Sequence, residues 1–352
     1  MQTKRVRFPK ITIGVDLGDR QSVICEIDRK GAVVGRSTIR TAKASVREYF
    51  AGRERSRVVL EAGTHSPWFA REVEAHGHEV IVANPGRIYG ARRRKNDPKD
   101  AEFLARQGRA DVTLLHPISH RSSEAQKELA MIRARDQLVG ARTKLINHVR
   151  GAVKAQGGRL RKCSAEAFAT RATSELPEET RAALIPLLDI IAGMTATIRQ
   201  YDQQIEKLVA TSYPEAARLM QPKGVGALTA LAFLLLVGDP TRFSHSRDAG
   251  PYFGLIPKLD DSGESQPQLR ISKAGDELGR RLLVSAAQYI LGPFGPDCDL
   301  RRHGLKIAAR GGKNAKKRAA VAVARKLAVL LHKLWVSGAE YDPDWVLKHR
   351  AV

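Results

Sequence analysis

The chain has few cysteines, few aromatic residues and no long apolar run, and each shortage excludes some classes of protein. Its three cysteines are far apart, which supports neither a disulfide framework nor a cysteine zinc site and fits a reducing, cytoplasmic setting. Aromatic residues make up 5% and are not interleaved with basic runs, which argues against a stacking platform for single-stranded nucleic acid. No apolar run reaches the length of a membrane span, so we expect no membrane partner.

Acidic residues are also in deficit, with 37 Asp and Glu against 60 Lys and Arg, for a net charge of +23. A protein this basic attracts polyanions, nucleic acid first, and its basic residues are not gathered on one amphipathic helix as a membrane-surface protein would have them. The 352 residues are enough for two or three domains. We therefore expect a nucleic-acid-binding protein that grips a duplex or A-form backbone.

The first third of the chain has the alternation and turn signals of a β-meander followed by α/β units. The pattern predicts strands over 11–17, 22–27, 32–39, 57–61 and 79–82, and helices over about 43–51, from Ser66 to about 77, and from about Asp97. The order βββαβαβα over residues 1–118 is that of a ribonuclease-H-like domain, in which the hairpin strands are antiparallel and the later strands parallel to the first.

Two further regions follow, both mainly helical. Residues 119–213 carry two long apolar periodicities, separated by a less regular stretch, and predict two long helices that pair as an antiparallel hairpin or across subunits. Residues 214–352 predict shorter helices over 227–237, 276–291 and 316–335. The predicted fold class is thus an α/β domain, a long coiled-coil middle region for oligomerisation, and a mostly helical C-terminal domain.

Four acidic residues are conspicuous in so basic a chain. Asp16 lies in the first strand, Glu61 ends the fourth, and Asp97 and Asp100 begin a helix, where an i, i+3 pair shares one face. Since the two strands are neighbours in such a sheet, we expect the four carboxylates at one edge, as ligands for Mg²⁺. Two metal ions about 4 Å apart can clamp the oxygens of a phosphoryl transfer. Taken alone, Asp97-Pro98 is also a good helix cap, and capping and metal binding are compatible.

Basic and glycine-rich positions supply candidate phosphate contacts. A basic run precedes Asp97, a glycine pair precedes the predicted helix 227–237, and further cations lie in the C-terminal region, where a solvated helix face is the alternative interpretation. The candidates for nucleic-acid binding are Arg92, Arg93, Arg94, Lys95, Gly224, Gly226, Arg270, Lys273, Arg280, Arg281, Lys316 and Lys317.

Several motifs in one order resemble a known family. They are I-G-V-D-L-G (13–18), L-E-A-G (60–63), N-D-P-K-D-A (96–101), F-G-L-I-P (253–257) and I-S-K-A-G-D-E-L-G-R-R-L-L (271–283). This pattern resembles the DEDD transposases of the insertion-sequence one-ten family, which share their plan with pilin-gene inverting recombinases. The resemblance covers nearly the whole chain.

The resemblance implies a function and a mechanism. The family's four acids match Asp16, Glu61, Asp97 and Asp100, which would hold Mg²⁺ as two ions or one shared site, with Mn²⁺ as an alternative. Its nucleophilic serine matches Ser262, implying a covalent phosphoserine intermediate on DNA. It also implies a homo-oligomer, dimer to tetramer, acting on donor and target DNA with a structured non-coding guide RNA. By itself Ser262 is an ordinary turn residue, and Ser265 is its rival.

Three other functions are compatible with parts of the sequence. A resolvase-like metal-dependent nuclease would use the four carboxylates without a covalent intermediate. The segment 13–18 also suits the phosphate loop of an actin-like ATPase or sugar kinase, but no second matching repeat follows. A non-catalytic nucleic-acid-binding protein would explain the charge and leave the four acids unexplained.

Overall fold

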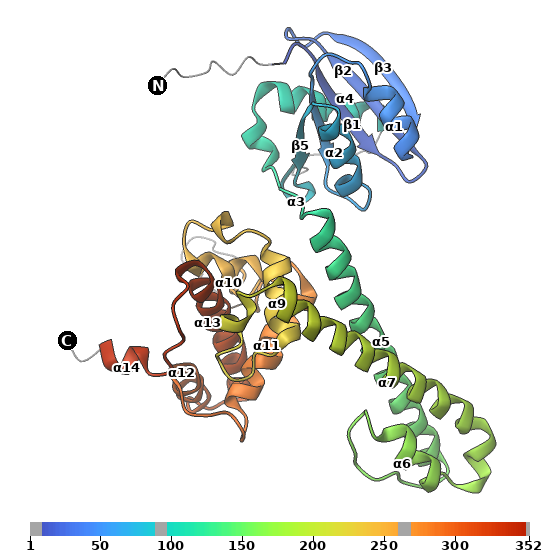
Figure 1. Ribbon diagram of the computed structural model, residues 1–352, viewed down its shortest axis with the longest axis vertical. Helices are drawn as coiled ribbons and strands as arrows, with labels where there is room; N and C mark the ends of the chain where they lie inside the picture. The colour runs from blue at the N-terminus through green and yellow to red at the C-terminus, as the bar shows by residue number, and fades with distance from the viewer. Residues whose placement is uncertain (1–8, 89–96, 260–268, 350–352) are drawn as a thin grey trace. The chain divides into compact units, whose positions relative to one another are not determined.

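The computed structural model describes residues 9–88, 97–259 and 269–349, with the side chains of Arg87, Ile88 and Asp97 left out. The predictions for the basic run 92–95 and for Ser262 and Ser265 therefore lie outside the described residues. The chain forms two compact units, Met1–Arg121 and Ser122–Val352 (Figure 1).

The first unit is built on a five-stranded mixed sheet. Its strands are β1 (Thr12–Leu17), β2 (Gln21–Ile27), β3 (Val33–Arg40), β4 (Arg57–Glu61) and β5 (Glu79–Ala83), in the order β3-β2-β1-β4-β5. β1, β2 and β3 pair antiparallel, whereas β4 and β5 run parallel to β1. The strand positions and directions expected from the sequence are confirmed.

Helices cover both faces of this sheet. On one face, α1 (Lys43–Phe50) and α2 (Ser66–Ala75) bury Phe50 and Phe69 against apolar side chains of β1, β2 and β4. On the other face lies α4 (Asp97–Ala110), followed by η1 (Val112–Leu115), while α3 (Pro85–Ile88) follows β5. Ser66, expected from the sequence to be the N-cap of α2, is instead its first residue, because the Ser66 hydroxyl bonds back to Gly63 and His65 takes the cap position.

The second unit begins with a helical hairpin. Its arms are α5 (Ser123–Ala155) and α7 (Glu178–Ser212), and the connection between them contains α6 (Phe168–Glu175), which the sequence did not predict. The arms run antiparallel, because Arg135 pairs with Asp202 at 2.9 Å while Arg142, further along α5, donates to Thr195 at 3.2 Å. Of the two pairings considered, the hairpin within one chain is the one observed (Figure 1).

Helix α7 corrects one reading of the sequence. Within the described residues it is the one helix long and apolar enough to cross a membrane, by length and composition, so the statement that no apolar run reaches that length was wrong. The apolar side chains of α7 have partners inside the unit, since Leu188 and Ile191 pack in a core with α5 and α6, and Ile205 packs in the larger core beyond the hairpin.

The remaining helices belong to the same unit as α9 (Ala227–Val237), which is apolar except for Thr229. They are α8 (Ala216–Leu219), η2 (Pro240–Arg242), η3 (Ser246–Asp248), α10 (Ala249–Tyr252), α11 (Glu277–Leu291), α12 (Asp299–Ala308), α13 (Ala315–Ser337) and α14 (Trp345–His349). Because α9 is apolar on every side, α11, α13 and the adjoining ends of α5 and α7 bury it in one core. The predictions for α9, α11 and α13 are confirmed, whereas α12 was not predicted.

Candidate active site

Asp16 and Glu61 lie side by side at the carboxyl ends of two parallel strands. Val15 on β1 pairs in register with Leu60 on β4, one residue before each acid. Val15 and Leu60 point into the core beneath α1 and α2. Since successive side chains of a strand alternate between faces, Asp16 and Glu61 point to the opposite face, the one covered by α4, and both are half-buried.

The direction of α4 brings its acidic start to the same edge. Near the end of α4, the Gly108 carbonyl accepts a 2.8 Å bond from Arg57, the first residue of β4. Nearer its start, α4 passes over Gly14, where a Cβ atom would lie 1.9 Å from the Ala101 carbonyl oxygen. The helix therefore runs opposite to β1 and β4, and its N-terminus lies toward their carboxyl ends.

Asp100 is buried, 8% exposed, one turn into α4, and α4 begins at Asp97. The structure thus brings Asp16, Glu61 and Asp100 to one edge of the sheet, where the sequence predicted them. Among the side chains that the structure describes, no three His, Cys, Asp or Glu are gathered closely enough to hold a metal ion.

The same edge carries polar residues that the sequence analysis did not single out. His65 lies just after β4, with its Nε2 3.4 Å from Asp19 Oδ1, and its Nδ1 accepts a 3.1 Å bond from the Trp68 indole. Asn84 follows β5 and accepts a bond from the Gly86 amide. The sequence could have indicated both residues, because polar residues immediately after parallel strands line the crevice where ligands bind in open α/β sheets.

In the second unit, the loop predicted to carry the nucleophile is held at both ends. Pro257 and Ile271 form an antiparallel bridge. The Lys258 amide donates to the Arg270 carbonyl at 2.9 Å, and the Ser272 amide donates to Ile256 at 2.8 Å. These bonds close the base of the segment containing Ser262, and we call residues 254–258 and 270–275 the loop base.

The two arginines predicted after this loop make contacts within the chain. Arg280 donates from Nη1 to three backbone carbonyls at 3.1–3.2 Å, those of Lys273 and Ala274 in the loop base and that of Phe253 just before it. Arg281 lies 2.6 Å from Asp136 on α5. Their observed contacts stabilise the loop base and its attachment to the hairpin.

The glycine pair before α9 has two distinct environments. Gly224 adopts φ 97° and packs so closely on α11 that a Cβ atom would lie 3.0 Å from the Ala286 carbonyl oxygen. Gly226 is exposed, is the N-cap of α9, and has open space around a potential Cβ. Gly224 therefore shapes the turn, while Gly226 leaves the start of α9 accessible.

A basic groove of about 1800 Å³ adjoins the loop base. Its walls come from the loop base, α12, α13 and the residues after α13, and ten of the lining residues are Lys or Arg against three Asp or Glu. Arg270, Lys273 and Lys317, all predicted from the sequence, line it, and Lys316 is exposed beside Lys317. Burial, followed by the nearby cations of α12 and α13, lowers the pKa of His303 in this groove.

Comparison with known proteins identifies the class. A model of the DEDD transposases of the IS110 type, described as a transposase, matches residues 13–156, and the model "Transposase IS116/IS110/IS902 family" matches residues 216–297. The chain is 29% identical to the transposase for insertion sequence element IS1111A of Coxiella burnetii, over 92% of this chain and 88% of the relative. The chain is a DNA transposase.

Two further relatives bear on the family to which this transposase belongs. The chain is 30% identical to a putative transposase, y4pF/y4sB, of Sinorhizobium fredii, over 81% of this chain and 74% of the relative. It is 25% identical to the pilin gene-inverting protein of Moraxella bovis, over 81% of each chain. The chain belongs to the IS110 family of transposases.

Proposed function

We propose that this transposase cuts and exchanges the DNA strands of an insertion sequence with a carboxylate-held divalent metal and a serine nucleophile. The observation that carries the proposal is the convergence of Asp16, Glu61 and the start of α4 at one edge of the sheet. The strand order and the helix across it also support assigning residues 1–118 to the ribonuclease-H-like class. In that fold class, an acidic edge of this kind is where phosphodiester chemistry is expected.

The donor set fits Mg²⁺. Asp16, Glu61, Asp97 and Asp100 offer only carboxylate oxygens, the ligands that this hard cation prefers, and Mn²⁺ accepts the same set. When bound, the metal would supply charge neutralisation at the phosphate and at the attacking and leaving oxygens. Because α4 packs directly on Gly14, the helix that begins with these aspartates is held close to β1.

Ser262 is the proposed nucleophile. Its Oγ would form a bond to the phosphorus as the bond from phosphorus to the leaving deoxyribose oxygen breaks; the serine proton is lost and the leaving oxygen gains one. The loop base supports this role, since the hydrogen-bonded segments 256–258 and 270–272 and the Arg280 contacts hold both ends of a polar loop. A loop fixed at its ends presents its tip with less loss of conformational entropy.

The proposed assembly follows the regions expected from the sequence. Residues 119–213 form the coiled-coil oligomerisation region, supported by the long α5–α7 hairpin, and residues 214–352 form the domain that carries the serine. We place the chain in a dimer or tetramer guided by a structured non-coding RNA. The proposed nucleic-acid contacts are the run 92–95, Gly226 at the start of α9, and the cations at 270, 273, 281, 316 and 317, while Arg280 is assigned to holding the loop base.

Strand exchange with labelled DNA and the RNA encoded by the element tests the mechanism. Ser262→Ala should abolish both exchange and a covalent protein–DNA adduct on denaturing gels, whereas Ser265→Ala should keep both. An adduct that persists in Ser262→Ala and disappears in Ser265→Ala would move the nucleophile to Ser265. Metal-dependent cleavage without any adduct would instead support the resolvase-like nuclease.

A further inference from the structure

The residues after α13 occupy part of the basic groove of the second unit. This stretch, residues 339–349, which we call the C-terminal segment, contributes Glu340, Asp342 and Trp345 to the groove lining beside cations of α12 and α13. Two of the three acidic residues that line the groove belong to it. The chain thus places its own carboxylates in a groove whose other walls are rich in positive charge.

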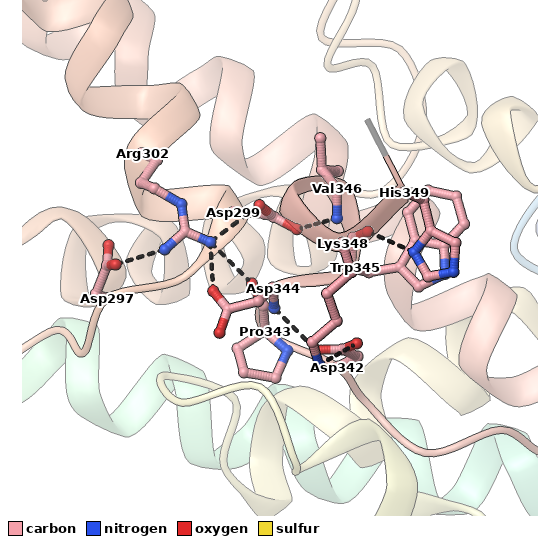
Figure 2. Close-up of polar contacts among 10 residues, drawn as sticks. All are labelled: Asp297, Asp299, Arg302, Asp342, Pro343, Asp344, Trp345, Val346, Lys348 and His349. Carbon is pink, nitrogen blue, oxygen red and sulfur yellow. Dashed lines mark hydrogen bonds and ion pairs between the residues drawn. The ribbon is translucent and has the colours of Figure 1, made fainter. Parts of the chain in front are cut away.

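Arg302 of α12 is the main attachment point (Figure 2). Its guanidinium contacts the carboxylates of Asp297, Asp299 at 3.0 Å and Asp344 at 2.5 Å, and these contacts raise its pKa further above the usual value. Asp297 and Asp299 belong to the start of α12 and the residues before it, whereas Asp344 comes from the C-terminal segment. Around Arg302, carboxylate oxygens take the positions that phosphate oxygens take at an arginine in nucleic-acid complexes.

Tyr341 is half-buried beside Cys298, and its amide donates to Gln221 at 2.6 Å; beyond it, the other attachments of the segment are polar and superficial. The Val346 amide donates to Asp299 at 2.6 Å, and the Asp299 amide donates to the Pro343 carbonyl at 2.8 Å. The Lys333 ammonium lies 4.5 Å from the centre of the Trp345 ring. No residue of α14 is buried, and the Trp345 ring is half exposed. Contacts of this kind at the surface are weak and are screened by salt, so they exchange readily for others.

We propose that the basic groove binds the phosphate backbone of duplex DNA and that the C-terminal segment is an internal competitor, displaced when DNA phosphates replace its carboxylates. The inference rests on the proposed function in that DNA is the substrate. The charge of the groove walls supports it: Lys306 on α12 and Arg310 just beyond its end follow Arg302, and Lys326 and Lys333 line the groove from α13. Such a row suits a regularly spaced polyanion.

Binding of a labelled DNA duplex by the full chain, measured over a range of salt concentrations, tests the groove. Lys326→Ala should weaken binding several-fold and reduce the salt slope by about 1, as expected for one lost phosphate contact. Arg171→Ala, which removes an exposed charge on α6, is the matched control and should have a smaller effect. Equal effects of the two variants would overturn the groove assignment, as would binding of duplex RNA in the groove without binding of DNA.

The competitor is tested by removing a carboxylate. Asp344→Asn should tighten DNA binding about 3–10-fold, because Arg302 is freed. Asp189→Asn makes the same charge change at an exposed position of α7 and should tighten binding less. In an Arg302→Ala background the gain from Asp344→Asn should vanish. Equal gains from Asp344→Asn and Asp189→Asn would contradict the competitor.

Hydrogen exchange in the unmutated chain gives a second measurement that does not depend on a variant folding. Addition of duplex DNA should accelerate exchange of the Val346 amide, which is bonded to Asp299. Unchanged or slower exchange would overturn displacement. These binding readouts need no chemistry, so a failed Ser262→Ala result would refute the nucleophile and leave them intact.

Discussion

Gly14 on β1 faces the Ala101 carbonyl of α4 so closely that a Cβ atom there would lie 1.9 Å from the oxygen and 2.5 Å from the Ala105 amide nitrogen. Both neighbours are helix backbone, which cannot rotate away. The contact sets the distance between the strand that carries Asp16 and the helix that carries Asp100. A single hydrogen atom in place of a methyl group is what allows the acids on the two elements to share one edge.

Gly14→Ala should therefore push α4 away from the sheet and reduce the free energy of unfolding by about 1–3 kcal/mol, the usual range for overpacking. Strand cleavage should fall with it, because Asp97 and Asp100 move with the helix. Urea unfolding and a cleavage assay measure the two effects. Gly63→Ala, where a Cβ atom meets open space, should leave stability within about 0.5 kcal/mol of the original.

Removal of single carboxylates should show which acids hold the metal. Asp16→Asn and Asp100→Asn should each weaken Mn²⁺ binding measured by calorimetry and abolish cleavage, since a carboxamide carries no charge to balance the cation. Glu74→Gln, on the exposed side of α2, should change neither. Metal affinity that survives in Asp16→Asn would remove β1 from the proposed site. Chelation of divalent ions should stop cleavage and leave non-catalytic DNA binding in place.

Substitution of Arg280 distinguishes a structural role of this residue from a contact with nucleic acid. Loss of its bonds to three backbone carbonyls should reduce the free energy of unfolding of Arg280→Ala by about 1–3 kcal/mol. We expect strand exchange to fall, because the loop base loosens, while the salt slope of DNA binding stays constant. Unchanged stability with a smaller salt slope would instead establish the phosphate contact predicted from the sequence.

His78 should make the first unit sensitive to acid. Its Nδ1 accepts a bond from the Ser56 amide and its Nε2 donates to the Phe50 carbonyl, so the neutral ring is the bonded form. Burial, opposed by the Phe50 bond and reinforced by His76 and Arg53, lowers the pKa of His78. The unfolded chain then binds the proton more readily, so stability is lost as the pH falls below the unfolded value of about 6.5 toward the lower folded value.

Thermal unfolding from pH 7.5 to 5 measures this loss. In His78→Gln, whose side chain does not titrate, the melting temperature should fall less over the same range. A parallel decline in the two proteins would show that other groups dominate the acid response.

The alternation of residues 11–39 and the turns between them predicted the order and direction of the strands, because local pattern and tertiary pairing agree in this sheet. The acidic edge was predictable for the same reason, since Asp16 lies one residue before the end of β1 and Glu61 ends β4. Arg280 was assigned to phosphate on charge alone, and its observed bonds depend on carbonyls that only the folded loop base brings together.

The groove and the C-terminal segment were beyond the sequence for a related reason. The cations of α12 and α13 are far from Arg270 in the chain, and the ten-residue helix α12 was not predicted from the sequence. Asp344 approaches Arg302 across 42 residues, and nothing in the local pattern predicts that pairing. Helix α7 shows the opposite error, because a long apolar helix with partners on several sides has the composition of a membrane span.

The two ends of the α5–α7 hairpin belong to different cores. Near the root, Leu129 and Ile132 pack with α9, while near the tip Val149 and Val153 pack with α6 in a separate cluster. A helix of 33 residues at 1.5 Å per residue spans about 50 Å, close to the length of about 15 base pairs at 3.4 Å each. The hairpin therefore sets a fixed separation: partners bound at its root and at its tip would be held about one and a half turns of duplex apart.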